Sequence, residues 1–405
     1  MSERRGYHWL TYRGVLLGLL ILVGPWTAAP YFRGDEVAGR DFALGPNFFI
    51  NRWTYEPGLD TRLQLAQATN YFHGAGGSLS SRDLYLVHLL DVQHELTDHY
   101  RVQVHYLRDR DFDGSYQRFT TGLGRRWGNA GWIEILGEPV PNKALADIGA
   151  AIEQAGARWT GRLQLMWPNW LYDTKNMDAG RMHTVPNIQV SVAWQPRPSW
   201  RWTLHADLDP PRRWLNPSES FDFHFEKYQG DVELYWFPDA QAAWHLRWLG
   251  EWSDHQRDGL AQRDPAAFTL QRTYWIASLE YTSQREEWLG WRAGALHVRF
   301  DEDWVFAHDS KATLWTDRYD RILFAGHAWP LQGPWYLNTM AIVSLLSDHR
   351  ETGEERLSDR SEQLQARTAG SMVFAGDTFR LEGGAAVNWH RARFGGGFVK
   401  VWVDF

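Results

Sequence analysis

The sequence contains no cysteine in 405 residues. This absence excludes disulfide frameworks, thiolate metal sites and cysteine nucleophiles together. The sequence also has no excess of positive charge, since its formal net charge is -7 at pH 7. No basic block stands out, so we expect no nucleic-acid partner.

Long apolar runs are also missing, apart from one near the N-terminus. Gly14 to Gly24 is apolar, and it is followed by a small-residue region that ends at Ala29. The run is short for a membrane span and follows basic residues, a pattern typical of signal peptides: Arg4, Arg5 and Arg13. We predict a signal peptide over residues 1–29 that directs export through the inner membrane, although Pro30 disfavours cleavage directly after Ala29. A retained N-terminal anchor is the alternative.

Tryptophan, in contrast, is abundant. The chain holds 25 Trp, and 15% of its residues are aromatic. The mean hydropathy is nevertheless only -0.49. This combination is expected where aromatic rings lie at two membrane–water interfaces while every second residue faces water.

Apolar and polar residues alternate along most of the chain after residue 58. In one such segment Trp200, Trp202 and Leu204 lie on one face, while Arg201 and Thr203 lie on the other. Period two predicts a strand with one apolar and one wet face. The same alternation recurs over residues 158–165, 187–195, 244–253 and 379–390.

Short turns alternate with longer polar connections between these segments. Short turns lie at residues 97–99, 128–131, 197–198 and 332–334, and longer connections at 172–184, 209–220, 256–267, 303–315 and 350–360. This layout predicts an all-β fold, a transmembrane antiparallel up-and-down β-barrel of about eighteen strands. Weak segments at 144–154, which could instead be a short helix, and at 41–55 leave sixteen strands as the alternative. We assign residues 30–58 to a periplasmic or lumenal segment and residues 59–405 to the barrel.

The C-terminus carries the most specific motif. Val399, Val401, Val403 and Phe405 alternate with polar or aromatic residues and end the chain on Phe. The chain here resembles the Gram-negative outer-membrane β-barrel superfamily, in which porins are found. The resemblance implies that these residues form the signal read by the barrel-assembly machinery. It also implies contact with outer-membrane lipid and lipopolysaccharide.

Basic residues recur on the predicted inward faces, mostly just after a short turn. We single out eight as pore-lining: Arg101, Arg158, Arg162, Arg201, Arg247, Arg380, His205 and His245. A collar of arginines at one end of the lumen would favour anions. Inward acidic residues offer the competing interpretation, in which these arginines form structural ion pairs along the wall: Asp231, Glu233, Glu280 and Glu382.

Catalytic and metal motifs are not evident, so we expect a protein that is not an enzyme and holds no metal or cofactor. Asp-His pairs occur at strand ends, at residues 98–99, 254–255 and 348–349. A rim dyad from these residues is conceivable, but ordinary polar rim residues explain them better. The inward histidines show no close ligand spacing.

These features favour a channel for small polar solutes, anions among them. One alternative is an export conduit for an acidic exopolysaccharide, similar in outline to alginate exporters. Another is a barrel that sheathes a partner, within a multiprotein export or electron-transfer complex. A homo-oligomer is compatible with each of these functions. The aromatic segment at residues 304–306 either constricts the pore or packs at the rim.

Overall fold

The computed structural model describes fourteen stretches of the chain. They are residues 70–79, 84–111, 114–137, 145–172, 181–183, 185–216, 221–239, 242–259, 267–283, 290–306, 313–352, 357–376, 379–389 and 393–404. The predicted signal peptide (1–29) and the segment 30–58 lie outside these residues, as does the weak strand at 41–55.

Within the described residues the protein is built from strands. They are β1 (Asn70–Leu79), β2 (Leu84–Thr97), β3 (Tyr100–Asp111), β4 (Gly114–Trp127), β5 (Gly131–Gly137), β6 (Leu145–Ala155), β7 (Trp159–Tyr172), β8 (Arg181–His183), β9 (Asn187–Arg197), β10 (Trp200–Asn216), β11 (Phe221–Trp236), β12 (Ala243–Gly259), β13 (Phe268–Thr282), β14 (Gly290–Phe306), β15 (Thr313–Pro330), β16 (Trp335–Thr352), β17 (Leu357–Ala375), β18 (Phe379–Asn388) and β19 (Arg393–Asp404).

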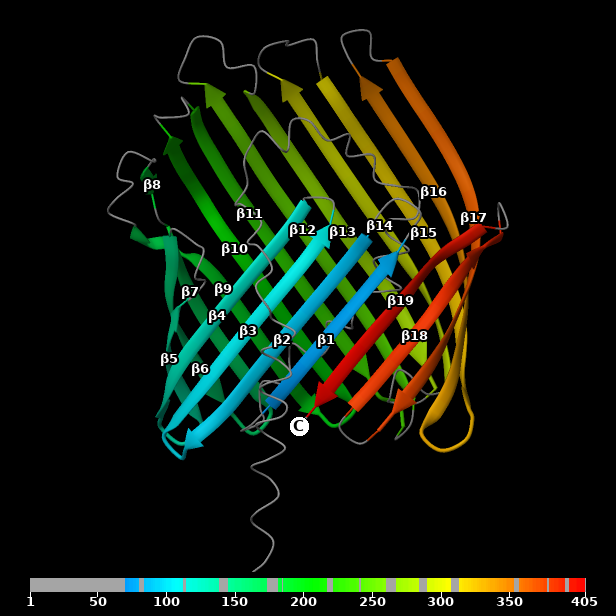
Figure 1. Ribbon diagram of the computed structural model, residues 1–405, viewed down its shortest axis with the longest axis horizontal. Helices are drawn as coiled ribbons and strands as arrows, with labels where there is room; N and C mark the ends of the chain where they lie inside the picture. Colours follow the sequence, from blue (N-terminus) through cyan, green and yellow to red (C-terminus); the bar gives the residue numbers. More distant parts are fainter. Residues whose placement is uncertain are drawn as a thin grey trace, which may run out of the picture.

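These segments form one antiparallel, up-and-down sheet. Each strand pairs with its neighbour in the chain, except that β8 and β9 both lie beside β10 and share one place in the order. The first strand pairs with the last, from Phe72 opposite Asp404 to Leu79 opposite Gly397. These pairings join the two edges of the sheet into a ring (Figure 1). The predicted all-β, antiparallel, up-and-down class is confirmed. The weak segment at 144–154 is a strand, β6, and not a helix.

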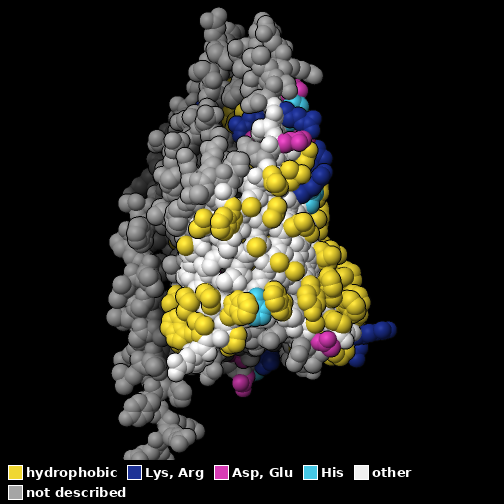
Figure 2. Space-filling view, turned by 90° about the vertical axis from the view of Figure 1, so that its right-hand side faces the viewer, with side chains coloured by type: hydrophobic (Ala, Val, Ile, Leu, Met, Phe, Trp, Pro, Cys, Tyr) yellow, Lys and Arg dark blue, Asp and Glu magenta, His cyan; other side chains and the backbone are white. Residues whose placement is uncertain are grey.

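The predicted alternation sets the two faces of the wall. On β12, Trp244, Leu246 and Trp248 are exposed on the outside, whereas His245 and Arg247 point inward and are partly buried. Exposed tryptophans gather close to the short-turn ends of the strands, as an interfacial girdle requires: Trp127, Trp159, Trp194, Trp236, Trp244, Trp291, Trp329 and Trp335. Figure 2 shows this apolar band at the lower end of one face and charged side chains toward the upper end.

The short turns lie where the sequence predicts them. Two contain a glycine with a positive φ, 63° at Gly128 and 64° at Gly333. This backbone conformation is one that L side chains rarely adopt, so glycine suits these tight connections. The turns bring consecutive strands into direct antiparallel register.

The longer connections are shorter than predicted, because the strands continue into them. β10 runs on through Asn216, past a register shift between Asp209 and Arg212. Pro210 and Pro211 lie within the predicted connection 209–220, and a bulge accommodates them in the strand although prolines cannot donate to the ladder. Trp304 lies in β14 at an inward position and packs against Phe268, with ring centroids 5.3 Å apart, in a buried apolar cluster of the inner face. The two interpretations of residues 304–306, a pore constriction and packing at the rim, stay predictions.

The inner face is less uniformly polar than predicted. On β12 to β16 it carries a buried apolar cluster: Leu249, Tyr274, Leu296, Val298, Phe300, Ile322, Phe324 and Ile342. On the outer face of β14 and β15, conversely, His297, Arg299 and Arg321 interrupt the apolar band. The simple rule of apolar outside and polar inside therefore holds on β9 and β10. It fails on β14 and β15, where both faces mix the two kinds, and it is interrupted on β7 and β12 by the inward residues Met166 and Leu249.

Candidate functional site

The inner wall between β3 and β12 gathers the polar and charged side chains that could contact a solute. Strands place every second residue on this face, so polar groups from several neighbouring strands meet on it. The site is therefore a surface of ion pairs and hydrogen bonds, and its side chains form three clusters.

The first cluster joins four strands. Arg101 on β3 donates through Nε to Oε1 of Glu134 on β5, at 2.7 Å, and through Nη2 to Oε2 of Glu153 on β6, at 2.8 Å. Arg162 on β7 lies 2.6 Å from the other oxygen of Glu134. The Arg101 guanidinium also covers the ring of Trp132, 4.5 Å from its centroid. Two arginines thus share two carboxylates that are almost fully buried.

Glycine makes this cluster possible. Gly124 on β4 lies directly opposite both Arg101 and Glu134. A Cβ at Gly124 would lie 3.0 Å from Cγ of each of them. The absent side chain lets the arginine cross β4 and reach carboxylates on the next two strands.

The second cluster lies on β10 to β12. Arg247 donates through Nε to Asp231 at 3.0 Å and through Nη2 at 2.6 Å, and it lies 3.6 Å from Glu233. His245 lies 3.3 Å from Glu233 and stacks on Tyr235, with ring centroids 4.2 Å apart. The guanidinium of Arg201 is 5.9 Å from the centroid of Tyr235.

The third cluster is a ladder of amides and carboxylates on β7, β9 and β10. Asn187 donates to Asp207 at 2.5 Å and to Asp209 at 2.9 Å. Gln189 donates to the second oxygen of Asp207 at 3.2 Å. Nearby, the Ser191 hydroxyl and Nδ1 of His205 form a hydrogen bond of 2.8 Å. This part of the wall presents acceptor-rich, negatively charged groups.

The structure thus brings most of the predicted pore-lining residues into two of these groups. Arg101 and Arg162 share the first cluster, while Arg201, Arg247 and His245 share the second, with His205 beside it on β10. Arg158 lies apart, exposed in a short turn, where it donates to the carbonyl of Pro196 at 2.9 Å. Arg380 is on β18 opposite Ala375, and its side chain lies outside the described residues.

Four carboxylates of the site were not singled out from the sequence: Glu134, Glu153, Asp207 and Asp209. Each sits at an inward position of an alternating strand, and that parity was the available signal. Of the acidic residues named as partners for the arginines, Asp231 and Glu233 pair with Arg247, Glu280 pairs with Arg292, and Glu382 accepts a hydrogen bond from Ser371.

The C-terminal motif lies in β19. Val399, Val401 and Val403 are paired through their backbones with Gly77, Ala75 and His73 of β1, so this strand closes the ring. Phe405 lies outside the described residues. The assembly role of these four residues remains a prediction.

The described structure does not support a catalytic Asp-His dyad at residues 254–255 or 348–349. Asp254 and His255 are consecutive on β12 and point to opposite faces. Asp348 accepts hydrogen bonds from Arg350. Among the described residues no group of three His, Asp or Glu side chains could hold a metal ion.

The described part of the chain contains no helix long and apolar enough to cross a membrane. The outer face of the wall is suited to contact with lipid, since large apolar side chains are exposed on it above the tryptophan girdle: Leu246, Leu279, Leu323 and Val343. A ring of antiparallel strands satisfies its backbone groups internally, which hydrocarbon requires. Barrels of this kind lie in the outer membrane of Gram-negative bacteria, and this protein is located there.

Comparisons with known proteins add no closer relationship. No protein-family model matches the chain, and no curated protein matches it. Among solved structures it is similar to a bacterial polysaccharide outer membrane secretin, at 8% identity and a TM-score of 0.35, over 84% of this chain and 99% of that one. It is also similar to OccAB2 of Acinetobacter baumannii, at 8% identity and a TM-score of 0.37, over 83% and 96% of the two chains. A loop-deletion mutant of OmpT of Vibrio cholerae scores 0.37 at 8% identity, over 83% and 98%. Likenesses at this level carry no argument about function.

Proposed function

We propose that the protein is an outer-membrane channel for small polar solutes. The observation that carries this proposal is the charged inner wall from β3 to β12 inside a ring whose outer face is apolar. Such a wall suits a passage for water and hydrated solutes, because charged and amide side chains favour polar solutes over apolar ones.

The arginines of the wall act, in this proposal, mainly as structural partners of carboxylates. Arg101, Arg162 and Arg247 each face two acidic groups. Among the described inward side chains of β10 to β12, the carboxylates outnumber the lysines and arginines by five to four. The acidic set is Asp207, Asp209, Asp231, Glu233 and Glu251, and the basic set is Arg201, Lys227, Arg247 and Arg257. We therefore propose a weak preference for cations. The anion preference expected from the sequence stays a prediction that the same experiment tests.

Conductance of the purified protein in planar lipid bilayers tests both statements. We expect stepwise currents, and a reversal potential in a salt gradient whose sign indicates cation preference. The variant Asp207→Asn with Glu251→Gln should shift this potential toward the anion side, whereas Arg201→Gln should shift it the other way.

Three results would count against parts of the proposal. A folded protein that inserts but never conducts would exclude a channel and favour the alternative in which the barrel sheathes a partner. A conducting wild type with clear anion preference, reduced by neutralising Arg158, Arg201 and Arg247, would restore the arginine collar. Anionic exopolysaccharide that blocks the current from the periplasmic side would favour the export conduit.

A further inference from the structure

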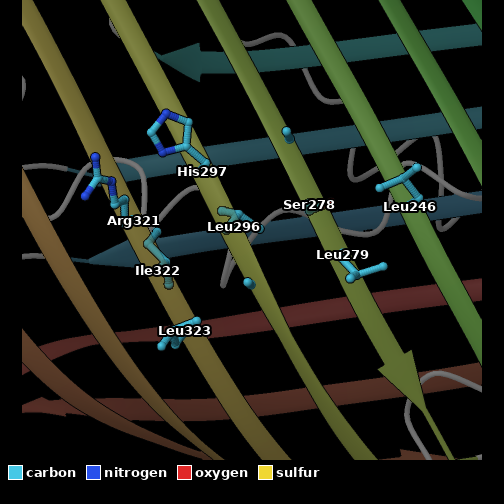
Figure 3. A pocket seen from close by; sticks show the side chains of 10 residues that line it. Leu246, Ser278, Leu279, Leu296, His297, Arg321, Ile322 and Leu323 are labelled. Carbon is cyan, nitrogen blue, oxygen red and sulfur yellow. The ribbon is translucent and has the colours of Figure 1, made fainter.

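The outer wall carries an open groove of about 380 Å³ across β12 to β15. Figure 3 looks at this wall from outside, with the opposite side of the ring behind it. The outward side chains that line the groove are Leu246, Ala277, Leu279, Ala295 and Leu323, together with His297 and Arg321. The groove is therefore apolar along most of its length and cationic at one place.

The depth of the groove comes from small residues between large ones. Leu279 lies opposite Ala295, and Ala295 lies opposite Leu323. The leucines are strongly exposed, 46% for Leu279 and 62% for Leu323, whereas each alanine adds only a methyl group between them. Two leucine ridges with an alanine floor form a trough for a flexible chain of methylene groups.

The cationic end is formed by a cross-strand pair. His297 and Arg321 face each other in the register of β14 and β15. Arg321 is exposed and its guanidinium lies 5.3 Å from the ring centroid of Tyr319. Among the described residues no carboxylate lies within ion-pair distance of Arg321. The nearby acids Asp301 and Asp317 are each 3.4 Å from Arg299 instead.

The height of Arg321 on the wall indicates which leaflet of the membrane it would contact. It precedes the girdle residue Trp329 by eight positions on β15. At a rise of about 3.3 Å per residue and a tilt of about 40°, this places Arg321 about 20 Å above the girdle at the short-turn end. The apolar band of such barrels is about 25 Å tall, so Arg321 sits just below the headgroups of the leaflet on the long-connection side. A cation there is stabilised by an anionic headgroup from above.

We propose that this groove is a binding site for the phosphorylated, acylated lipid of the outer leaflet, the lipid A part of lipopolysaccharide. One acyl chain lies along the alanine floor between Leu279 and Leu323. A phosphate of the headgroup accepts charge-assisted hydrogen bonds from Arg321 and His297. The inference concerns the outer face alone and does not depend on whether the lumen conducts.

Native mass spectrometry of the full-length mature protein in detergent tests the proposal. The protein is titrated with bis-phosphorylated lipid A, with the same lipid after dephosphorylation, and with phosphatidylglycerol. We expect lipid A to bind the wild type about tenfold more tightly than either of the other two lipids, a difference of about 1.4 kcal/mol. Equal affinity for lipid A and its dephosphorylated form would overturn the proposal, as would equal affinity for phosphatidylglycerol.

Variants then locate the site. Arg321→Gln combined with His297→Gln should lower the affinity for lipid A to that of the dephosphorylated lipid. Ala295→Phe should fill the trough and weaken binding of both lipids. Arg360→Gln, which removes an exposed arginine near the rim, is the matched control and should bind as the wild type does. If the double variant folds, as judged by heat-modifiable electrophoresis, and still binds lipid A normally, the assignment to this groove is wrong.

Discussion

Arg101 and Glu153 are joined by two parallel hydrogen bonds, 3.2 Å from Nη1 to Oε1 and 2.8 Å from Nη2 to Oε2, although they lie three strands apart. The pair is buried, and the same guanidinium also holds Glu134. Interactions of this reach tie β3, β5 and β6 together beyond the backbone ladder. They link the side chains of these strands on the inner face of the wall.

Removing the guanidinium should destabilise the barrel. Arg101→Met removes one of the two guanidinium groups that Glu134 and Glu153 share and leaves both buried carboxylates facing Arg162. Breaking a buried pair in this way costs about 3–5 kcal/mol. Equilibrium unfolding in urea, in lipid vesicles, measures the loss. Arg360→Met is the control and should cost less than about 1 kcal/mol, because its ion pair with Glu362 is exposed. Equal losses for the two variants would show that the buried cluster has no special weight.

A side chain at Gly124 should disturb the same cluster. Gly124→Val places branched carbons where Cβ alone already lies 3.0 Å from Arg101 and Glu134, and overpacking of this kind costs about 1–3 kcal/mol. Gly370→Val is the matched control, since a Cβ there meets nothing within 4 Å. The control should be neutral, because β-branched residues suit exposed strand positions. The free energy of unfolding of both variants decides the point, and a neutral Gly124→Val would contradict the close packing.

An arginine introduced on the outer face should destabilise the barrel more, the closer it lies to the middle of the apolar band. Ala341→Arg puts a guanidinium near the middle of the apolar band and should cost about 2–4 kcal/mol. Leu364→Arg, on the neighbouring strand near the upper edge of the band, should cost about 1 kcal/mol or less. The same urea unfolding experiment applies. If both substitutions are harmless, this part of the wall does not face hydrocarbon.

The last residue should matter for assembly and not for stability. Deletion of Phe405 should lower the amount of folded barrel in the outer membrane severalfold, because the terminal strand carries the resemblance to the assembly signal. Heat-modifiable electrophoresis of outer-membrane fractions measures the folded fraction. Phe405→Trp keeps an aromatic end and should assemble nearly normally. Normal assembly of the deleted chain would remove the assigned role of the motif.

The architecture could be predicted from the sequence because side chains alternate between the two faces of a strand, so the alternation of apolar and polar residues indicates which face each residue lies on. Trp244 and Arg247 fall on opposite sides of β12 in the sequence pattern and in the structure alike. Strand ends were less accessible. Pro210 and Pro211 indicate a loop by their chemistry, yet β10 passes through them by shifting register.

The site was only partly accessible. The inward position of Arg101 follows from parity, but its partners lie on β5 and β6, and only the absence of a side chain at Gly124 lets it reach them. No periodicity encodes such a contact across three strands. The inward apolar cluster around Val298 and Ile322 was missed for a related reason, since both faces of β14 and β15 mix polar and apolar residues.

Site-directed spin labelling along β10 tests the central claim, that this wall separates lipid outside from water inside. The natural chain has no cysteine, so single cysteines at Leu204, His205, Ala206 and Asp207 can be labelled without background. In reconstituted vesicles we expect labels at 204 and 206 to be accessible to oxygen dissolved in lipid, and labels at 205 and 207 to be accessible to a water-soluble nickel chelate. Equal access of the chelate to all four positions, or an alternation of the opposite phase, would contradict the account.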